Sequence, residues 1–473
     1  MDSPEGVGAR FLADWIMGQE PQEPRLKDAP TFHRNLEAVL DAKRENKTLV
    51  TSVKAIWRMG DGIDFSSNDM LSLGSSGKIR AAFLDELAHN PDFPLYAGGS
   101  RLMDGNYHYV EDTEQMIADF HEAETGLIMN SGYNANLAIY SSLPLADDVI
   151  VYDELVHTST LDGMILSAAT AKVSFSHNDI ASLRQTLHNV LNTYPKIRDA
   201  SNSVLISVES VYSVDGDVCP LREMVTVARE VCSRGNIAFI VDEAHATGVI
   251  GPKGSGLVNS LGMEKDVAIR LHTCGKALAS SGAIILGSST VRAALLNYAH
   301  PIIYTTAPPF HSVAGMRASY GLLSSGATHG SQIRIQHLVK HFFQTITANP
   351  IWAKASAMGI LLIPVMSEGW EDEKNTFTHI VPVWSRQKYT WWLLFHLLLL
   401  RISAQPVDYP TVPKGKSRIR IMFHAANEEK HVEYLADTLC DFAKEMIEIE
   451  ESSETGRVPR AAQQVYALMQ GTT

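Results

Sequence analysis

The stretches VDEAHATG (residues 241–248) and TCGKAL (residues 273–278) decide the fold that the sequence predicts. Asp242 follows the apolar run 237–241 (IAFIV), and similar runs rich in β-branched residues occur at 148–152 and 203–208. Such runs are typical of parallel strands that are buried on both faces. Helix-length segments lie between them, at 180–191 and 221–235. Strand–helix alternation at this spacing predicts a doubly wound α/β domain with a central, mostly parallel sheet.

Composition excludes several classes of protein. The chain has 473 residues, 45% of them hydrophobic, and a net charge of −13 without a basic run. These values indicate a globular protein with a large core and no nucleic-acid partner. The four cysteines are scattered, which argues against a zinc site or a disulfide scaffold. The N-terminus lacks the features of a signal peptide, and the apolar segment 391–400 is too short to span a bilayer, so we expect a cytoplasmic protein without a metal site or an integral membrane segment.

The sequence divides into four regions. Residues 1–60 are expected to form an N-terminal arm with an amphipathic helix at 32–46. Residues 61–307 carry the strand–helix alternation, and residues 308–450, after Pro308-Pro309, suit a smaller C-terminal α+β domain. Residues 451–473 read as a polar tail, and residues 365–376 as a surface loop.

Polar side chains follow three of the expected strands. His157, Ser213 and Asp242 each come shortly after an apolar run. Ligands bind beyond the carboxyl ends of the strands in open α/β sheets, so these residues predict one site. Lys276 stands among small residues, which favours access of an aldehyde to its amine. A lysine and a strand-end aspartate are the two groups that pyridoxal 5'-phosphate (PLP) chemistry needs at opposite edges of one ring.

A glycine-containing segment offers a second part of the site. Residues 130–136 (NSGYNAN) precede an apolar helical run, and exposed amides at a helix N-terminus can bind phosphate. The alternative is a plain capped helix. Taken singly, Lys276 could be a surface residue, Asp242 an ordinary strand-end aspartate and His245 a loop histidine. Their order along the chain, together with the glycine segment, favours a common site.

Together these motifs resemble the α-oxoamine synthase family of fold-type I PLP-dependent enzymes, in particular its 8-amino-7-oxononanoate synthase-like members. The resemblance covers residues 64–436. It rests on 68–73 (NDMLSL), 98–102 (GGSRL), Gly105-Asn106, 131–133 (SGY), 153–157 (DELVH), 209–217 (ESVYSVDGD), 242–248, 273–278 and 417–420 (SRIR).

The resemblance implies a role for each matching residue. Lys276 would hold PLP covalently and later remove a proton from the substrate, with Asp242 at the pyridine nitrogen, His157 on the ring face, and His245 and Ser213 near the ring oxygen. Thr273 and the amides around Gly132 and Tyr133 would bind the phosphate. Arg420 would take the substrate carboxylate, with Asn68 assisting. Family members are dimers, so Thr305 and Thr306 would reach the phosphate of a partner subunit.

The resemblance also implies an activity. The enzyme would condense alanine, serine or glycine with an acyl thioester, carried by coenzyme A or a carrier protein, and release carbon dioxide to leave an α-amino ketone. Two alternatives stay open at this point. One is a fold-type I aminotransferase, which uses the same lysine and aspartate. The other is a non-catalytic partner subunit, although relatives of that kind lack the lysine.

Overall fold

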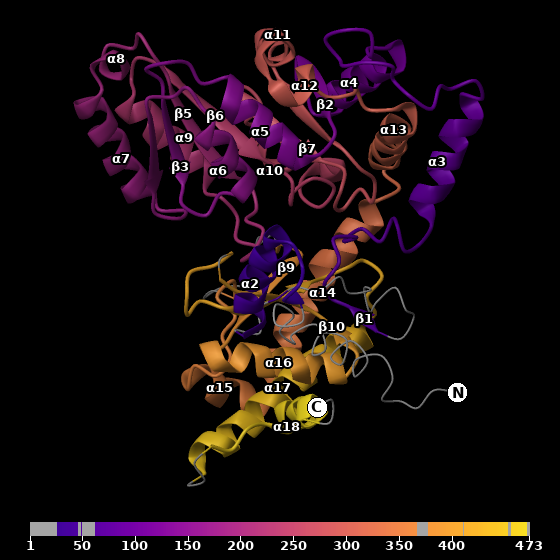
Figure 1. Cartoon of the computed structure of the whole chain (residues 1–473), viewed down its shortest axis with the longest axis vertical. Coiled ribbons are helices and arrows are strands. Elements are labelled where there is room, and N and C mark those ends of the chain that lie inside the picture. The colour runs from indigo at the N-terminus through magenta and orange to yellow at the C-terminus, as the bar shows by residue number, and fades with distance from the viewer. Residues whose placement is uncertain are drawn as a thin grey trace.

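The computed structural model describes residues 26–45, 49, 62–366, 377–409, 411–452 and 456–470. A large α/β domain occupies the upper part of Figure 1 and a smaller domain the lower part. Most of the predicted arm (residues 1–60) and of the predicted loop (residues 365–376) lies outside the described residues. Helix α2 (Thr31–Glu45) agrees with the helix expected there, but Leu36 and Val39 on its apolar face are exposed.

A seven-stranded sheet forms the centre of the large domain. Its spatial order is β2 (Thr125–Met129), β8 (Ala283–Gly287), β7 (Ile269–Thr273), β6 (Ile237–Asp242), β5 (Val204–Glu209), β3 (Val149–Asp153) and β4 (Ala171–Phe175). The pairs from β7 to β4 are all parallel, whereas β8 runs antiparallel to both of its neighbours. The mostly parallel sheet expected from the apolar runs is therefore confirmed.

Helices cover both faces of this sheet because its strands are apolar on both sides. In β3, Val149 and Val151 pack into one buried cluster with α7 (Ile180–Thr193) and α9 (Leu221–Val231). Ile150 points into the opposite cluster with α5 (Gly132–Ser142) and α6 (Thr158–Ile165). The alternation follows the two-residue period of a strand. The other helices of this part of the chain are α3 (Lys78–His89), α4 (His108–Phe120), α8 (Pro195–Arg198), α10 (Leu257–Leu261), α11 (Ser289–Tyr298), α12 (His300–Ile303) and α13 (Phe310–Ser324).

The small domain packs helices against a three-stranded antiparallel sheet. The sheet has the order β11 (Gln405–Val407), β12 (Arg418–Met422), β9 (Ile380–Trp384). Its helices are α14 (His329–Ala348), α15 (Pro350–Ala357), α16 (Gln387–Leu399), α17 (Glu429–Glu451) and α18 (Arg460–Gln470). The short strand β1 (Ile63–Asp64) pairs with β10 (Ile402–Ser403), so the start of the region 61–307 joins this domain.

The region predicted as a polar tail contains a packed helix. Ala461, Ala462 and Val465 of α18 are buried in the main hydrophobic cluster. These small apolar residues contact the small domain along α16. Within the described residues, no helix combines the length and hydropathy needed to cross a membrane, and no group of acidic, histidine or cysteine side chains is arranged to hold a metal ion.

A buried ionic network ties the glycine-rich segment before α4 to the sheet. Glu114 of α4 accepts hydrogen bonds from Arg101 at 2.6 and 3.0 Å and from Arg292 at 3.1 Å. It also accepts from the backbone amide of Ile128 in β2 at 2.7 Å. Both Arg101 and Glu114 are buried, so the charges depend on one another for solvation.

Removal of the shared carboxylate is expected to destabilise the protein strongly. Glu114→Ala leaves the buried Arg101 guanidinium without its carboxylate and the Ile128 amide without an acceptor, and breaking a buried ion pair in this way costs about 3–5 kcal/mol. Urea unfolding followed by circular dichroism measures the change. The control is Glu230→Ala, which removes an exposed pair with Arg184 and should cost less than about 1 kcal/mol. Equal losses in the two variants would contradict this account of the network.

Candidate active site at the carboxyl edge of the sheet

The parallel strands end at one edge of the sheet and deliver the candidate residues there. Strand β3 leads into the turn with His157, β5 into the turn with Ser213, β6 ends at Asp242, and β7 ends at Thr273 before Lys276. Strand β2 runs parallel to β7, so its end also brings the start of α5 to this edge. Parallel pairing alone accounts for this convergence of segments distant in sequence.

Lys276 occupies a tight turn after β7. Hydrogen bonds from the Ala279 amide to the Lys276 carbonyl (2.8 Å) and from the Ser280 amide to the Cys274 carbonyl (2.9 Å) close the turn. Among the described residues, no group hydrogen-bonds to the Lys276 amine, which is partly buried. Burial lowers the pKa of Lys276, and the carboxylates of Asp242 and Glu209 offset only part of that effect. The amine is therefore unpaired, within electrostatic range of Asp242, and easier to deprotonate than a surface lysine.

A hydrogen-bond chain holds Asp242. Its Oδ1 accepts from the Ala244 amide at 2.9 Å, and its Oδ2 accepts from Asn136 Nδ2 at 2.8 Å. Asn136 also donates to the Ser159 hydroxyl at 3.0 Å, and that hydroxyl lies 2.7 Å from His157 Nδ1. The chain thus orients the carboxylate and the imidazole together. Sequence reasoning assigned no role to Asn136 or Ser159.

Glu209 supports the turn that carries His157. Its Oε1 accepts from the His157 backbone amide at 2.5 Å, and it pairs in register with Asp242 on the neighbouring strand. Burial, followed by the charge of Asp242, raises the pKa of Glu209 well above its usual range. A protonated Glu209 avoids a second negative charge beside Asp242. The side chain of His157 is exposed. Its pKa is nevertheless lowered, because the protein atoms around the ring desolvate it more than the charge of Asp242 compensates. As the last residue of a strand, Glu209 carried the same signal as Asp242.

The start of α5 lies beside Thr273. Ser131 caps the helix by accepting from the Asn134 amide at 3.1 Å. A Cβ atom at Gly132 would lie 3.6 Å from Thr273 Oγ1, so the two predicted phosphate-binding segments adjoin one another. Tyr133 is exposed at the helix start, and its hydroxyl bonds to Asp162. The capped-helix interpretation is therefore correct as local structure, and it leaves the site beside Thr273 available.

Three predicted residues carry buried polar atoms without a protein partner. These are Nδ1 of His245, Oδ1 of Asn68 and Nε of Arg420. The other guanidinium nitrogens of Arg420 donate to the Ser213 carbonyl at 2.9 Å and to Gln405 Oε1 at 2.6 Å. Burial lowers the pKa of His245 well below its usual range, and the charges of Lys276 and Arg420 act in the same direction. The site thus combines a cationic half with free hydrogen-bonding capacity.

Thr305 and Thr306 stand apart from this group. They lie in the loop after α12, and within the described part of the chain neither hydroxyl has a hydrogen-bond partner. The adjacent Ala307 amide donates to the Gly99 carbonyl at 2.8 Å, which links this loop to the glycine-rich segment. Thr306 is exposed. Their contact with the phosphate of a partner subunit stays a prediction.

Known proteins match this chain over most of its length. Residues 60–439 match the family described as aminotransferase class I and II. An aminoacyl transferase, sphA, of Aspergillus fumigatus is 58% identical over 96% of this chain and 96% of that protein. An 8-amino-7-oxononanoate synthase of Emericella nidulans is 39% identical over 89% of this chain and 98% of that protein. The chain belongs to the aminotransferase class I and II family, in its α-oxoamine synthase branch.

Solved structures agree on the fold of this α-oxoamine synthase. A serine palmitoyltransferase from S. paucimobilis, solved as a lysine-to-alanine variant with a bound PLP–myriocin adduct, superposes with a TM-score of 0.70. The match covers 88% of this chain and 99% of that one at 21% identity. At that identity the likeness shows the fold alone, which is the fold-type I architecture that the sequence predicts. The chain is thus assigned to a family of PLP-dependent acyltransferases.

The two hydrogen-bonding states of Glu209 lead to a testable contrast. Glu209→Gln keeps an acceptor for the His157 amide and mimics the protonated acid, so its affinity for added PLP should stay within about threefold of the parent. Glu209→Ala leaves the His157 amide unpaired, so the turn that carries His157 should shift and the affinity for PLP should fall roughly tenfold or more. Absorbance titration with PLP measures both. Equal weakening in the two variants would show that Glu209 acts as a charged carboxylate.

Proposed function

We propose that this α-oxoamine synthase condenses alanine, serine or glycine with an acyl thioester, releasing carbon dioxide and a free thiol and forming an α-amino ketone. The observation that carries the proposal is the partly buried amine of Lys276, which feels the charges of Asp242 and Arg420 and is free of hydrogen bonds among the described residues. A lysine that only stabilised the fold would bond to a neighbouring acceptor, and this one does not.

The residues of the site fit PLP. The unpartnered atoms of His245, Asn68 and Arg420 offer donors and acceptors on the substrate side. At the opposite side, Gly132 and Thr273 adjoin at the start of a helix, where amides and the helix dipole favour phosphate. When bound, PLP supplies an electron sink for negative charge at the substrate Cα.

Each residue then has a defined task. Asp242, held by Asn136, keeps the pyridine nitrogen protonated. His157, with its exposed ring, covers one face of the cofactor, and Lys276 takes the proton from the substrate Cα at its Nζ. Gly132, Tyr133 and Thr273 would hold the phosphate, and His245 and Ser213 would bond near the ring oxygen.

Arg420 is proposed to bind the substrate carboxylate. Its planar fork suits two carboxylate oxygens, and its Nε is buried without a protein acceptor. Burial lowers the pKa of Arg420, which nevertheless stays charged because the unperturbed value is so high. Asn68, which has a buried amide oxygen without a protein partner, is proposed to assist. The carboxylate thus sits where its loss as carbon dioxide leaves electrons at Cα.

We further propose that the enzyme is a cytoplasmic homodimer. Family members place the site at a subunit interface, and Thr305 and Thr306 are proposed to reach the partner's phosphate. The exposed Tyr304 beside them, and the exposed Leu95, Tyr96 and Met103, are apolar groups that a partner subunit would cover. The acyl donor is proposed to be coenzyme A-bound or carrier-bound.

Loss of the lysine amine should abolish cofactor attachment. Lys276→Ala is expected to lack the visible absorption band of lysine-bound PLP and to lose at least about 10³-fold in turnover, because one group serves both attachment and proton transfer. Lys265→Ala, which changes an exposed lysine, is the control and should keep both. A band of normal intensity in Lys276→Ala would contradict the assignment.

The products separate condensation from transamination. With alanine, serine or glycine and a panel of acyl thioesters, the proposal predicts thiol and carbon dioxide release in equal amounts and an amino ketone by mass spectrometry. An aminotransferase would instead form a keto acid without using the thioester. A protein that shows no band with PLP would be the non-catalytic partner subunit.

A further inference from the structure

A short loop of the large domain contacts the small domain beside the site. We call residues 212–217 of this loop the strap; they lie between Val211 and Val218, which form a β-bridge. On the small-domain side, the Ser213 carbonyl accepts from Arg420 Nη1 at 2.9 Å. The Gly216 carbonyl accepts from Thr378 Oγ1 at 2.6 Å. The strap is therefore the support on which Arg420 rests.

The contact between the strap and the small domain is close and charged. Asp215 forms an ion pair with Arg418, and its Oδ1 accepts from Trp384 Nε1 at 3.3 Å. Gly216 has a positive φ of 70°, and a Cβ there would lie 2.3 Å from the Ile380 carbonyl oxygen. The backbone at Gly216 thus meets β9 without room for a side chain, so the strap and the small-domain sheet are in close contact here.

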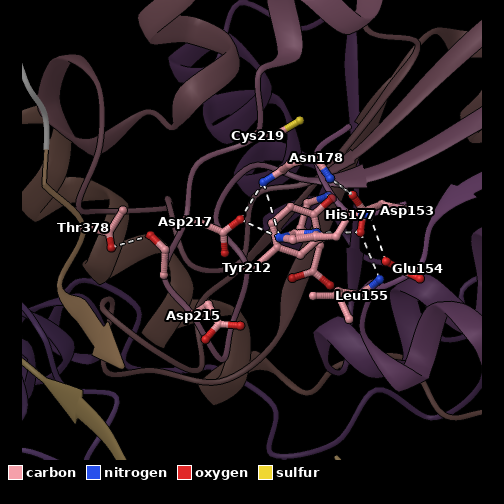
Figure 2. Close-up of polar contacts among 12 residues, drawn as sticks. Asp153, Glu154, Leu155, His177, Asn178, Tyr212, Asp215, Asp217, Cys219 and Thr378 are labelled. Carbon is pink, nitrogen blue, oxygen red and sulfur yellow. Dashed lines mark hydrogen bonds and ion pairs between the residues drawn. The ribbon is translucent and has the colours of Figure 1, made fainter. Parts of the chain in front are cut away.

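His177 anchors the strap to the large domain. Its Nε2 lies 2.6 Å from Asp217 Oδ2, and its Nδ1 lies 2.8 Å from Asp153 Oδ1. Asn178 contacts the same two carboxylates. Its side-chain Nδ2 donates to Asp217 at 2.5 Å, and its backbone amide donates to Asp153 at 2.8 Å. Figure 2 shows Asp217 pointing toward His177 and Asn178, while Thr378 reaches the strap from the small domain.

The bridging imidazole is a cation. Burial by itself would lower the pKa of His177, but hydrogen bonds to Asp153 and Asp217 raise it to about 10. With both ring nitrogens donating to carboxylates, each nitrogen must carry a proton. The Tyr212 and His177 rings pack edge to face, with their centroids 4.4 Å apart. The His177 side chain is thus charged at neutral pH, and its two carboxylate partners and Tyr212 fix the orientation of its ring.

The two carboxylates of this link belong to the two halves of the site. Asp153 is the last residue of β3 and begins the turn that carries His157. Asp217 closes the strap that supports Arg420 through Ser213. We propose that His177 is a positioning residue that holds the strap, and with it Arg420, at a set distance from the cofactor side of the site, and so tunes affinity for the amino-acid carboxylate. This inference rests on the proposed function.

The test is a spectroscopic titration that needs no turnover. His177→Gln keeps a side chain of similar size but has no charge and only one donor nitrogen, so it cannot replace the two separate ring nitrogens that contact Asp153 and Asp217. We expect its visible PLP band to persist, with cofactor affinity within about threefold of the parent. The amino-acid concentration that half-saturates the spectral change should rise about tenfold or more, because small displacements of a binding group cost this much. A separate steady-state assay serves as the comparison, in which the KM for the acyl thioester should change less than about twofold.

Controls separate positioning from folding. His337→Gln removes an exposed histidine that pairs with Glu429 at 2.9 Å in the small domain, and should leave all three constants unchanged. Asp217→Asn removes the charge that faces His177 with little change of shape, and should repeat the selective loss of amino-acid affinity if His177→Gln does not fold. Unchanged amino-acid affinity, or equal weakening of cofactor, amino acid and thioester, would overturn the positioning role. Absence of the PLP band in the parent protein would instead overturn the proposed function.

Discussion

Parallel pairing of β3, β5, β6 and β7 is the constraint on which the site depends. Because the carboxyl ends of these strands share one edge, a histidine, a serine, an aspartate and a lysine from distant segments meet there. The apolar strand residues pay for this arrangement by burial on both faces of the sheet.

Burial and charge act against one another at this edge. Desolvation lowers the pKa of Lys276 and raises that of Glu209, whereas Asp242 keeps hydrogen bonds to Asn136 and to a backbone amide. The raised pKa of Glu209 favours its protonated form, which places no second negative charge beside Asp242. The result is one negative charge facing one unpaired amine, which is the polarity that a protonated pyridine ring and a reactive lysine require.

Much of the large domain could be predicted from sequence because its signals are local. The runs at 148–152, 203–208 and 237–241 differ from the observed strands by one residue at their ends. The packing of α18 was missed, although Ala461, Ala462 and Val465 recur at helical spacing, because the polar residues that precede this helix suggested a tail. Support for Arg420 from Gln405 depends on the antiparallel register of β11 and β12, and the Asn136–Asp242 bond crosses the domain core. Such tertiary contacts have no local signature in the chain.

Chemical trapping tests the central claim most directly, namely that Lys276 and Asp242 hold one PLP ring from opposite edges. Borohydride reduction of the PLP-treated protein fixes a pyridoxal group to the lysine that binds it, and peptide mass spectrometry locates the label. The account predicts one label per chain, on Lys276, and a weakened visible band in Asp242→Asn. Labelling of a different lysine, or of several surface lysines without preference, would contradict it.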